Sequence, residues 1–327
     1  MHPFVEPHHG WSFSLDRVFS FRMKDVYTLA DLDDAAALNP PDTKPAKLAV
    51  IGYPVAHSRS PQLHQPALDA LNIDARYIRL ELQPGELTTA FAKMRDLGFI
   101  GTNVTVPHKF EALSSCTQLD PAAKALGSVN TILFEKEDNI LGFNTDGPGF
   151  VRAIREEFSV DIRDLRIMIV GAGGGAGQAL ATQCAREGCE QLVLVNRSLD
   201  KLASLTEKLL PYFESDKLDG PGNRLTSHGL DSPHLIELAG HCDLIVQTSS
   251  LGLKATDPSP IPSACLQPHH LVYDTIYQPP RTKLLSLAEA NGARIANGLS
   301  LLLHQGALSF EYWFPGTNPL PAMRSGQ

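Results

Sequence analysis

The stretch RIMIVGAGGGAG, residues 166–177, decides the fold of the second half of the chain. Its first five residues are typical of a buried β-strand and run directly into a glycine-rich turn. The residues from Gln178 to Arg186 favour a helix, which we expect to end at Gly188. A second apolar run, Leu192 to Val195, follows that helix. The predicted unit is therefore strand, glycine turn, helix and strand.

Such a unit is half of a Rossmann fold and predicts a site for the phosphates of a dinucleotide. Gly171 permits the tight turn, Gly173 lets the backbone approach a pyrophosphate, and Ala176 is expected to let helix and strand pack closely. Free backbone amides at the start of the helix attract anions. A glycine turn alone is weak evidence, because such turns also join strands to helices without a ligand. The turn residues predicted to bind the cofactor are Gly171, Ala172, Gly173, Gly174, Gly175 and Ala176.

The end of the second strand carries a cation where folds that bind NAD usually carry an acid. An Asp or Glu there accepts a hydrogen bond from the ribose 2′-hydroxyl, whereas this chain has Asn196 and Arg197. A guanidinium group matches the 2′-phosphate of NADP. Ser198 is expected to cap the next helix, and Lys201 to add a second cation, although Asp200 lies between them. We therefore predict that the cofactor is NADP and that Asn196, Arg197, Ser198 and Lys201 bind it.

Composition and charge narrow the class of protein. The 327 residues are 43% hydrophobic and 20% charged, which is typical of a soluble enzyme of two domains. A net charge of −8, with acidic and basic residues interspersed, leaves no basic footprint for a nucleic acid. No apolar run approaches the roughly 20 residues that span a bilayer, so no membrane partner is expected. Five cysteines without a Cys-x-x-Cys pair favour reduced thiols and the cytoplasm.

The order of elements predicts two α/β domains behind an N-terminal extension. From Leu48 onward strands alternate with helices, which predicts a mostly parallel sheet. The extension contains Trp11 and other aromatic residues that we expect to pack partly on the body, and three histidines that we expect not to bind a metal. The final helix, from Leu299 to Trp313, should return to the first domain. The predicted division is an extension at 1–46, a substrate domain at 47–146 and 298–327, and a Rossmann-type dinucleotide domain at 147–297.

Three polar clusters of the first domain follow strands or open helices, where α/β sheets build their clefts. They are HSRSP at residues 57–61, NVTVPHK at 103–109, and Asn130-Thr131 together with NTD at 144–146. With the glycine turn and Asn196-Arg197, they resemble the shikimate dehydrogenase family, in the family's order, over residues 47–315. The resemblance implies reduction of 3-dehydroshikimate to shikimate by NADPH, a step of aromatic amino-acid biosynthesis.

The resemblance also implies roles for individual residues. Lys109 and Asp146 match the catalytic pair: hydride addition to a ketone leaves an alkoxide, and a lysine ammonium beside it can donate the proton. Outside these motifs, a lone lysine at a helix start would be read as a surface residue. The implied substrate-binding residues are Ser58, Ser60 and Tyr277 for the carboxylate, and Asn103, Thr105, Asn130 and Gln305 for the ring hydroxyls. Ser60 could also serve as a helix cap, and Gln305 could lie on a solvated helix face.

Some positions depart from the family pattern. Gln247-Thr248-Ser249-Ser250 stands where Asn-Ala-Thr is frequent, and Ser300 stands where glycine is frequent. Both sites are expected to border the cofactor and the cleft. His57, His64, His108 and His304 have no evident carboxylate partner, and we expect most of them to be structural.

Alternatives to the main interpretation remain open at this stage. One is a quinate or shikimate dehydrogenase that prefers NAD, and the other is a noncatalytic sensor that binds NADP. Arg197 disfavours the first, and the intact pair of Lys109 and Asp146 disfavours the second. The sequence does not fix the oligomeric state and leaves a homodimer open.

Overall fold

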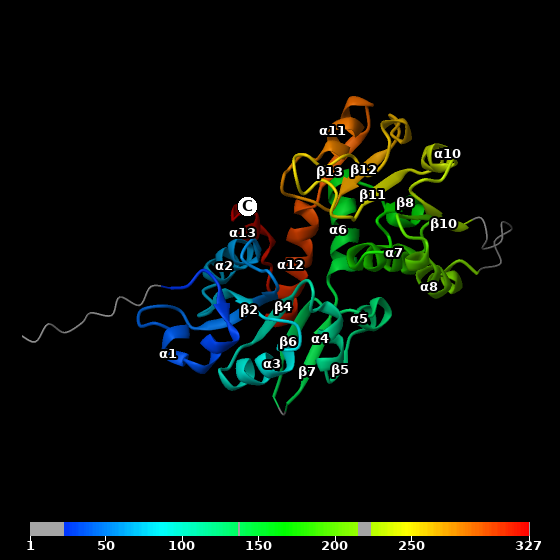
Figure 1. Cartoon of the computed structure of the whole chain (residues 1–327). Helices are drawn as coiled ribbons and strands as arrows, with labels where there is room; N and C mark the ends of the chain where they lie inside the picture. The colour runs from blue at the N-terminus through cyan, green and yellow to red at the C-terminus, as the bar shows by residue number, and fades with distance from the viewer. Residues whose placement is uncertain (1–22, 137, 215–223, 327) are drawn as a thin grey trace, which may run out of the picture.

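The computed structural model describes residues 23–136, 138–214 and 224–326, and it contains two β-sheets, each flanked by helices (Figure 1). One sheet has seven strands in the order β1-β3-β2-β4-β6-β7-β5, and the other has six in the order β10-β9-β8-β11-β12-β13. The prediction of a two-sheet α/β fold is therefore confirmed. The strands are β1 (Tyr27–Thr28), β2 (Ala46–Gly52), β3 (Arg76–Glu81), β4 (Gly101–Val104), β5 (Gln118–Leu119), β6 (Thr131–Phe134), β7 (Ile140–Phe143), β8 (Arg166–Val170), β9 (Gln191–Asn196), β10 (Leu225–Gly229), β11 (Leu244–Gln247), β12 (Leu271–Asp274) and β13 (Arg294–Asn297).

The helices alternate with these strands along most of the chain. The α-helices are α1 (Ala35–Leu38), α2 (Ser60–Ala70), α3 (Leu87–Asp96), α4 (Lys109–Ser115), α5 (Pro121–Leu126), α6 (Asp146–Phe158), α7 (Gly175–Glu187), α8 (Asp200–Leu209), α10 (Leu235–Gly240), α11 (Lys283–Ala290), α12 (Leu299–Trp313) and α13 (Leu320–Ser325). Short 3-10 helices occur at Leu29–Asp33, Ile162–Asp164, Leu210–Tyr212 and Ser263–Cys265.

The seven-stranded sheet is mostly parallel, as the alternation of elements predicts. Strands β1, β3, β2 and β4 pair in parallel, whereas β6 pairs antiparallel with both β4 and β7. One face packs against α2, α12 and α13, with Leu63 and Phe310 in that core. The other face packs against α3 and α4, with Phe91 and Ala112 in the core. Two buried faces explain the nearly continuous apolar runs of the central strands.

The segment before β2 contributes to this sheet. Its strand β1 pairs in parallel with β3, so that Tyr27 lies opposite Leu80. Tyr27, Leu32 and Leu38 are all buried in the core on the α3 side. Residues 23–45 therefore help to close this side of the sheet. Trp11 and the three N-terminal histidines lie outside the described residues.

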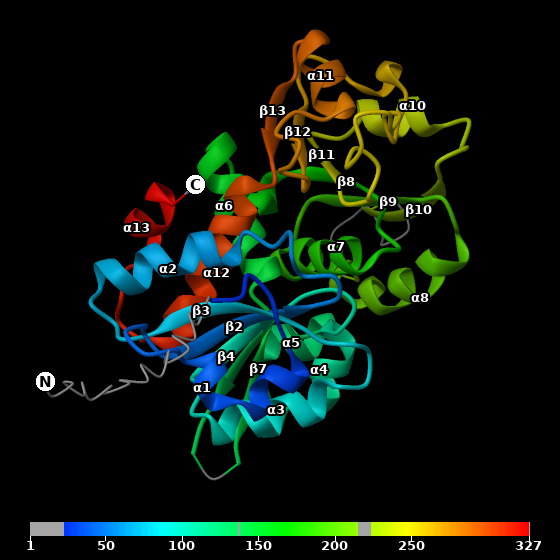
Figure 2. The ribbon, with the colours of Figure 1, turned by 60° about the vertical axis from the view of Figure 1, so that its left-hand side comes forward.

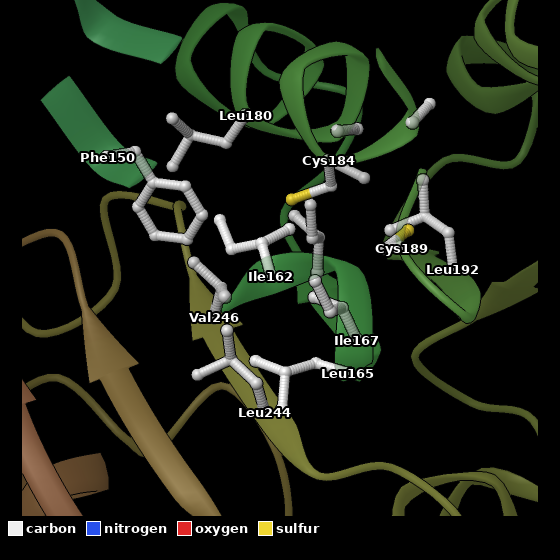
Figure 3. Packing of buried hydrophobic residues seen from close by; sticks show 14 of the residues in the cluster. Phe150, Ile162, Leu165, Ile167, Leu180, Cys184, Cys189, Leu192, Leu244 and Val246 are labelled. Atoms are coloured by element: carbon white, nitrogen blue, oxygen red, sulfur yellow. The ribbon is translucent and has the colours of Figure 1, made fainter. Parts of the chain in front are cut away.

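The six-stranded sheet is entirely parallel, and its chain order of strands is 3-2-1-4-5-6, with β8 as the first. Helices α6, α7 and α8 cover one face, where Phe150, Leu180 and Cys184 pack on Val246 (Figure 3). Helices α10 and α11 cover the other face. The order reverses between β8 and β11, and the carboxyl ends of parallel strands at such a reversal form the usual dinucleotide site.

Two helices lying side by side connect the sheets: α6 carries the chain into the six-stranded sheet and α12 carries it back (Figures 1 and 2). They approach closely at Gly149, where an added Cβ would lie 2.8 Å from the Gln305 backbone nitrogen. Glycine at this position therefore lets α12 bring Gln305 close to the start of α6.

Candidate active site

A cleft of about 460 Å³ is lined by strands of the seven-stranded sheet, by both connecting helices, and by α7 and the loop after β12 from the other half. It brings together every residue that the sequence predicts for catalysis or substrate binding. Ser58 comes from the loop after β2 and Ser60 from the start of α2. Asn103 lies in β4, Thr105 directly after it, Lys109 at the start of α4 and Asn130 directly before β6. Asp146 and Gln305 come from α6 and α12, and Tyr277 comes from the loop after β12. Ala176 of α7 lines the same cleft.

Lys109 and Asp146 form an ion pair in this cleft, with 2.6 Å between Nζ and Oδ2. Each is the first residue of its helix, and their side chains are 26% and 20% exposed. A carboxylate is favoured at a helix N-terminus and a cation is not. The carboxylate of Asp146 therefore offsets the unfavourable position of the Lys109 ammonium at a helix N-terminus. Partial exposure leaves the ammonium group accessible to a molecule in the cleft.

A buried amide holds the other oxygen of Asp146. Asn130 Nδ2 donates to Asp146 Oδ1 at 2.9 Å and to Thr145 Oγ1 at 2.9 Å. Asn130 Oδ1 accepts from the backbone nitrogen of Thr145 at 2.9 Å and from Thr131 Oγ1 at 3.0 Å. These contacts fix which end of the amide faces Asp146. Asn130 therefore orients the carboxylate that holds Lys109.

The two serines form a compact pair of hydroxyls, with 3.1 Å between Ser58 Oγ and Ser60 Oγ. Arg79 holds the loop by donating to the Ser58 carbonyl oxygen from Nε and Nη2, at 2.9 and 2.7 Å. The N-cap of α2 is Arg59, so the capping role considered for Ser60 is not the one observed. Ser60 is instead the first helical residue, and its backbone nitrogen donates to Ser58 Oγ at 3.3 Å.

Asn103 and Gln305 reach the cleft with most of their polar atoms already engaged. Asn103 accepts a hydrogen bond from Tyr77 Oη and donates to the Asn130 carbonyl and to Ser309 Oγ. Gln305 is half-buried and donates from Nε2 to the Leu302 carbonyl at 2.8 Å, which leaves Oε1 for the cleft. The alternative of a solvated helix face for Gln305 is therefore not observed.

A buried carboxyl group supports the loop that carries Tyr277. Asp274, at the end of β12, accepts from the Ile276 backbone nitrogen at 3.0 Å and from Thr282 Oγ1 at 2.6 Å. Burial raises the pKa of Asp274 to about 6, and these two hydrogen bonds only partly oppose the rise. Burial also raises the pKa of the Tyr277 phenol, which therefore remains a hydrogen-bond donor. Asp274 is thus a structural residue beside the cleft.

The glycine turn has the backbone that a phosphate site requires, with one correction. Gly171 has a φ of +88°, and an added Cβ would lie 2.8 Å from the Ser249 nitrogen. The expectation that Ala176 permits close packing is wrong, because Ala176 is exposed and lines the cleft. Gly177 has that role: a Cβ there would lie 2.4 Å from the Gly171 carbonyl oxygen. The helix ends at Gly188, as predicted.

A second pocket, of about 380 Å³, lies beside the turn and contains the predicted phosphate cations. Arg197 and Lys201 both line it, both are exposed, and neither forms an ion pair within the described part of the chain. Ser198 lines it too but does not cap α8, whose N-cap is Leu199. The other predicted residues in its lining are Gly171, Gly173, Gly174 and Asn196, whereas Ala172 is buried and Gly175 is exposed outside it.

The departures from the family pattern have local explanations. Gln247 is buried and its Nε2 donates to Ser249 Oγ at 2.9 Å and to the Leu251 carbonyl at 2.8 Å, so the loop closes on itself. Thr248, Ser249 and Ser250 line the phosphate pocket. The sequence predicts that these residues border the cofactor, without assigning them to this pocket. Ser300 is buried and its hydroxyl lies 3.1 Å from Tyr273 Oη.

Three of the four singled-out histidines are buried and contact the protein interior. His64 stacks on Tyr77 at 4.5 Å, His108 Nε2 lies 2.9 Å from the Leu82 carbonyl oxygen, and His304 Nε2 lies 2.8 Å from Glu156. The sequence predicts no carboxylate partner for these histidines, yet His304 has Glu156 and His108 Nδ1 lies 3.4 Å from Glu111 Oε2. His57 is exposed and lines the cleft.

Among residues 23–136, 138–214 and 224–326, no group of three or more His, Cys, Asp or Glu side chains could hold a metal ion. No helix in those ranges is long and apolar enough to cross a membrane.

Sequence reasoning missed Tyr77, Arg79 and Ser309, which support the cleft from other elements. Nothing in the local sequence sets them apart, because β3 (RYIRLE) and α12 (LSLLLHQGALSFEYW) each contain several other polar residues. Ser309 Oγ lies 2.7 Å from Thr131 Oγ1 and accepts from Asn103 Nδ2 at 2.9 Å. Each contact joins segments that are far apart in the sequence, so local pattern could not reveal it.

Comparison with known proteins identifies the family. Residues 50–132 match the model of the shikimate dehydrogenase substrate binding domain. A curated shikimate dehydrogenase (NADP(+)) of Methanopyrus kandleri is 37% identical over 285 residues, which cover 86% of this chain and 95% of that protein. The shikimate 5-dehydrogenase of Thermus thermophilus, solved with NADP(H) and shikimate, is 31% identical with a TM-score of 0.72, over 86% of this chain and 100% of that one. The shikimate 5-dehydrogenase of Listeria monocytogenes, solved with shikimate and NAD, is 29% identical with a TM-score of 0.75, over 86% and 96%.

The sequence relative covers both sheets, and the solved structures share their arrangement. The similarity therefore extends well beyond a common nucleotide-binding half. The chain belongs to the shikimate dehydrogenase family.

Proposed function

We propose that the protein catalyses the NADP-dependent reduction of 3-dehydroshikimate to shikimate, a step of aromatic amino-acid biosynthesis. One observation carries the proposal: the ion pair of Lys109 and Asp146 shares a cleft with Ala176, in the first turn of the helix that follows the glycine turn. Proton donor and dinucleotide site are thereby adjacent. The names of the curated relatives point to the same reaction.

The nucleotide pocket fits a phosphorylated dinucleotide. A Cβ at Gly173 would lie 2.6 Å from Asn196 Nδ2, so only glycine leaves the turn and the strand end this close. The first amides of α7 lack partners within the helix and point toward the turn, where a pyrophosphate would lie. Arg197 and Lys201 supply two exposed cations for a 2′-phosphate. Bound in this pocket, NADPH supplies the hydride.

The protein contributes the proton and the position of the ketone. As negative charge develops on the ketone oxygen, the Lys109 ammonium stabilises it and donates a proton, which yields the alcohol. In the oxidation direction the same amine accepts that proton. Asp146, itself held by Asn130, keeps the amine in place throughout.

The remaining cleft residues suit a polyhydroxylated ring with a carboxylate. The hydroxyls of Ser58, Ser60 and Tyr277 can donate to the carboxylate, and Thr105 and Gln305 offer groups for ring hydroxyls. The Asn130 amide is already engaged within the protein and acts on the cleft through Asp146. A site built to pair such hydroxyls rejects analogues that lack them, often by about four orders of magnitude. This complement supports a hydroxylated cyclic acid over an apolar ketone.

The test is a grid of initial rates with shikimate and quinate, each against NADP and NAD. We expect the highest kcat/KM for shikimate with NADP, and loss of that activity in the Lys109→Ala variant. Quinate with NAD as the best pair would favour the NAD-preferring alternative. NADPH binding without turnover in any combination would favour a sensor.

Two further aspects are proposals of the same kind. A cytoplasmic location is supported by the five cysteines, all of which are free thiols. A homodimer is tested by the molar mass in solution, which is 35.5 kDa for a single chain.

A further inference from the structure

A buried tyrosine below the cleft has no part in the reaction described above. Tyr77 lies in β3 and is 4% exposed, and its ring stacks on His64 with an interplanar angle of 3°. Its hydroxyl reaches past β2 and donates to Asn103 Oδ1 in β4 at 2.7 Å. Asn103 lines the cleft, whereas Tyr77 does not. Tyr77 is therefore placed to act on the cleft through another residue.

The contacts of Asn103 make the Tyr77 hydroxyl the donor that its amide oxygen needs. Asn103 Nδ2 faces the Asn130 carbonyl oxygen at 3.2 Å, an atom that can only accept, and also Ser309 Oγ at 2.9 Å. The amide oxygen must then face Tyr77. Burial raises the pKa of the Tyr77 phenol well above its usual value, so the hydroxyl keeps its proton. The orientation of Asn103 is thereby fixed from both ends.

Within the described part of the chain, Asn103 is the cleft residue to which the Tyr77 hydroxyl forms a hydrogen bond. Tyr77 is thus linked to a group expected to bind a ring hydroxyl. Asp146, the partner of Lys109, is held by a different side chain, that of Asn130, whose backbone carbonyl oxygen also accepts from Asn103.

We propose that Tyr77 is a positioning residue for the substrate, whose hydroxyl holds Asn103 in the orientation that the hydroxylated acid requires. The inference rests on the proposed function. Without the hydroxyl, Asn103 Oδ1 would lose its donor in a buried site, and the amide could turn away from the substrate. Substrate binding should weaken, while cofactor binding and proton transfer should not.

The test compares Tyr77→Phe with a matched control. Tyr27→Phe removes a hydroxyl from another buried tyrosine of the same sheet, whose oxygen accepts from Arg76 Nη1 at 3.0 Å and does not reach the cleft. For Tyr77→Phe we expect the KM for shikimate to rise about 3- to 10-fold, the range of one hydrogen bond. The kcat and the KM for NADP should stay within about twofold of wild type. The control should leave all three constants unchanged.

A double-mutant cycle with Asn103→Ala tests the route. If Tyr77 acts through Asn103, Tyr77→Phe should change the shikimate KM by less than about twofold in the Asn103→Ala background. Melting temperatures of all variants show that each is folded at the assay temperature. An unchanged KM, an equal effect of the control, or a fall in kcat with KM constant would each overturn the proposal. If wild type turns over shikimate, such a result defeats this inference alone; if wild type does not, the proposed function fails, and this inference with it.

Discussion

Replacing Asp274 with asparagine should make the protein more resistant to unfolding at neutral pH than at acidic pH, relative to wild type. The Asp274 side chain is fully buried, and no lysine, arginine or histidine is among the groups that shift its pKa. Burial raises the pKa from 3.8 to about 6. The folded protein therefore binds the proton more tightly than the unfolded chain does.

The sign and size of the effect follow from proton linkage. Below about pH 4 the carboxyl group is protonated in both states and costs nothing. As the pH rises from about 4 to about 6, the unfolded chain ionises first, and the free energy of unfolding falls. A rise of about two pKa units corresponds to ~3 kcal/mol at ~1.4 kcal/mol per unit. The cost remains constant above about pH 6, and asparagine does not incur it.

The measurement is the melting temperature of both proteins at several pH values between about 4 and 7. We expect the difference between Asp274→Asn and wild type to grow by roughly 6 to 12 °C over that range, at about 2–4 °C per kcal/mol. Asp243→Asn is the control: the hydrogen bond from Arg166 lowers the pKa of Asp243, so its proton linkage lies below about pH 4, and its difference from wild type should stay nearly constant over this range. A pH-independent difference for Asp274→Asn would refute the reasoning.

Three further changes test the nucleotide site and the chemistry. Arg197→Ala should weaken NADPH binding by about 1.5–3 kcal/mol and leave NADH nearly unchanged, as measured by fluorescence titration; equal losses would exclude the phosphate role. Lys109→Ala should lower kcat by roughly two to four orders of magnitude with a near-normal Kd for NADPH, and retained turnover would end its assignment as the proton donor. Gly177→Ala should weaken NADPH binding and lower the melting temperature, because its Cβ would collide with the Gly171 carbonyl oxygen. Gly175→Ala, whose nearest neighbouring atom is 4.0 Å away, should lower neither, and similar losses in both variants would contradict the packing argument.

The elements and the family were predictable from the sequence because their signals are local. The strand before Gly171, the helix end at Gly188 and the polar clusters after β4 each depend on a few adjacent residues. Strands β4 and β7 run in the same direction on either side of the antiparallel β6, so their carboxyl ends lie at one edge of the sheet, which is why Lys109 and Asp146 meet as expected. The confirmed predictions are therefore those that depend on the spacing of residues within a short stretch of sequence.

Other features depend on geometry that spacing does not encode. The small residue that lets α7 pack closely against the turn is Gly177, and Ala176 does not have this role. The angle at which α7 leaves the turn decides which of the two residues faces inward. Ser198 does not cap α8 because that helix begins later, at Asp200. Ser309 lies 206 residues beyond Asn103 in the sequence, and only the return of α12 to the first sheet makes them neighbours.

The paired crossing of α6 and α12 has a mechanical consequence. The two sheets are joined only by these adjacent helices within the described ranges, so any change in the angle between the sheets must pivot about this pair. Asp146 and Gln305 stand on the pivot itself and would travel least. If the two sheets move apart to exchange the nucleotide, the Asp146 carboxylate and the Gln305 amide would therefore keep nearly the same positions relative to each other.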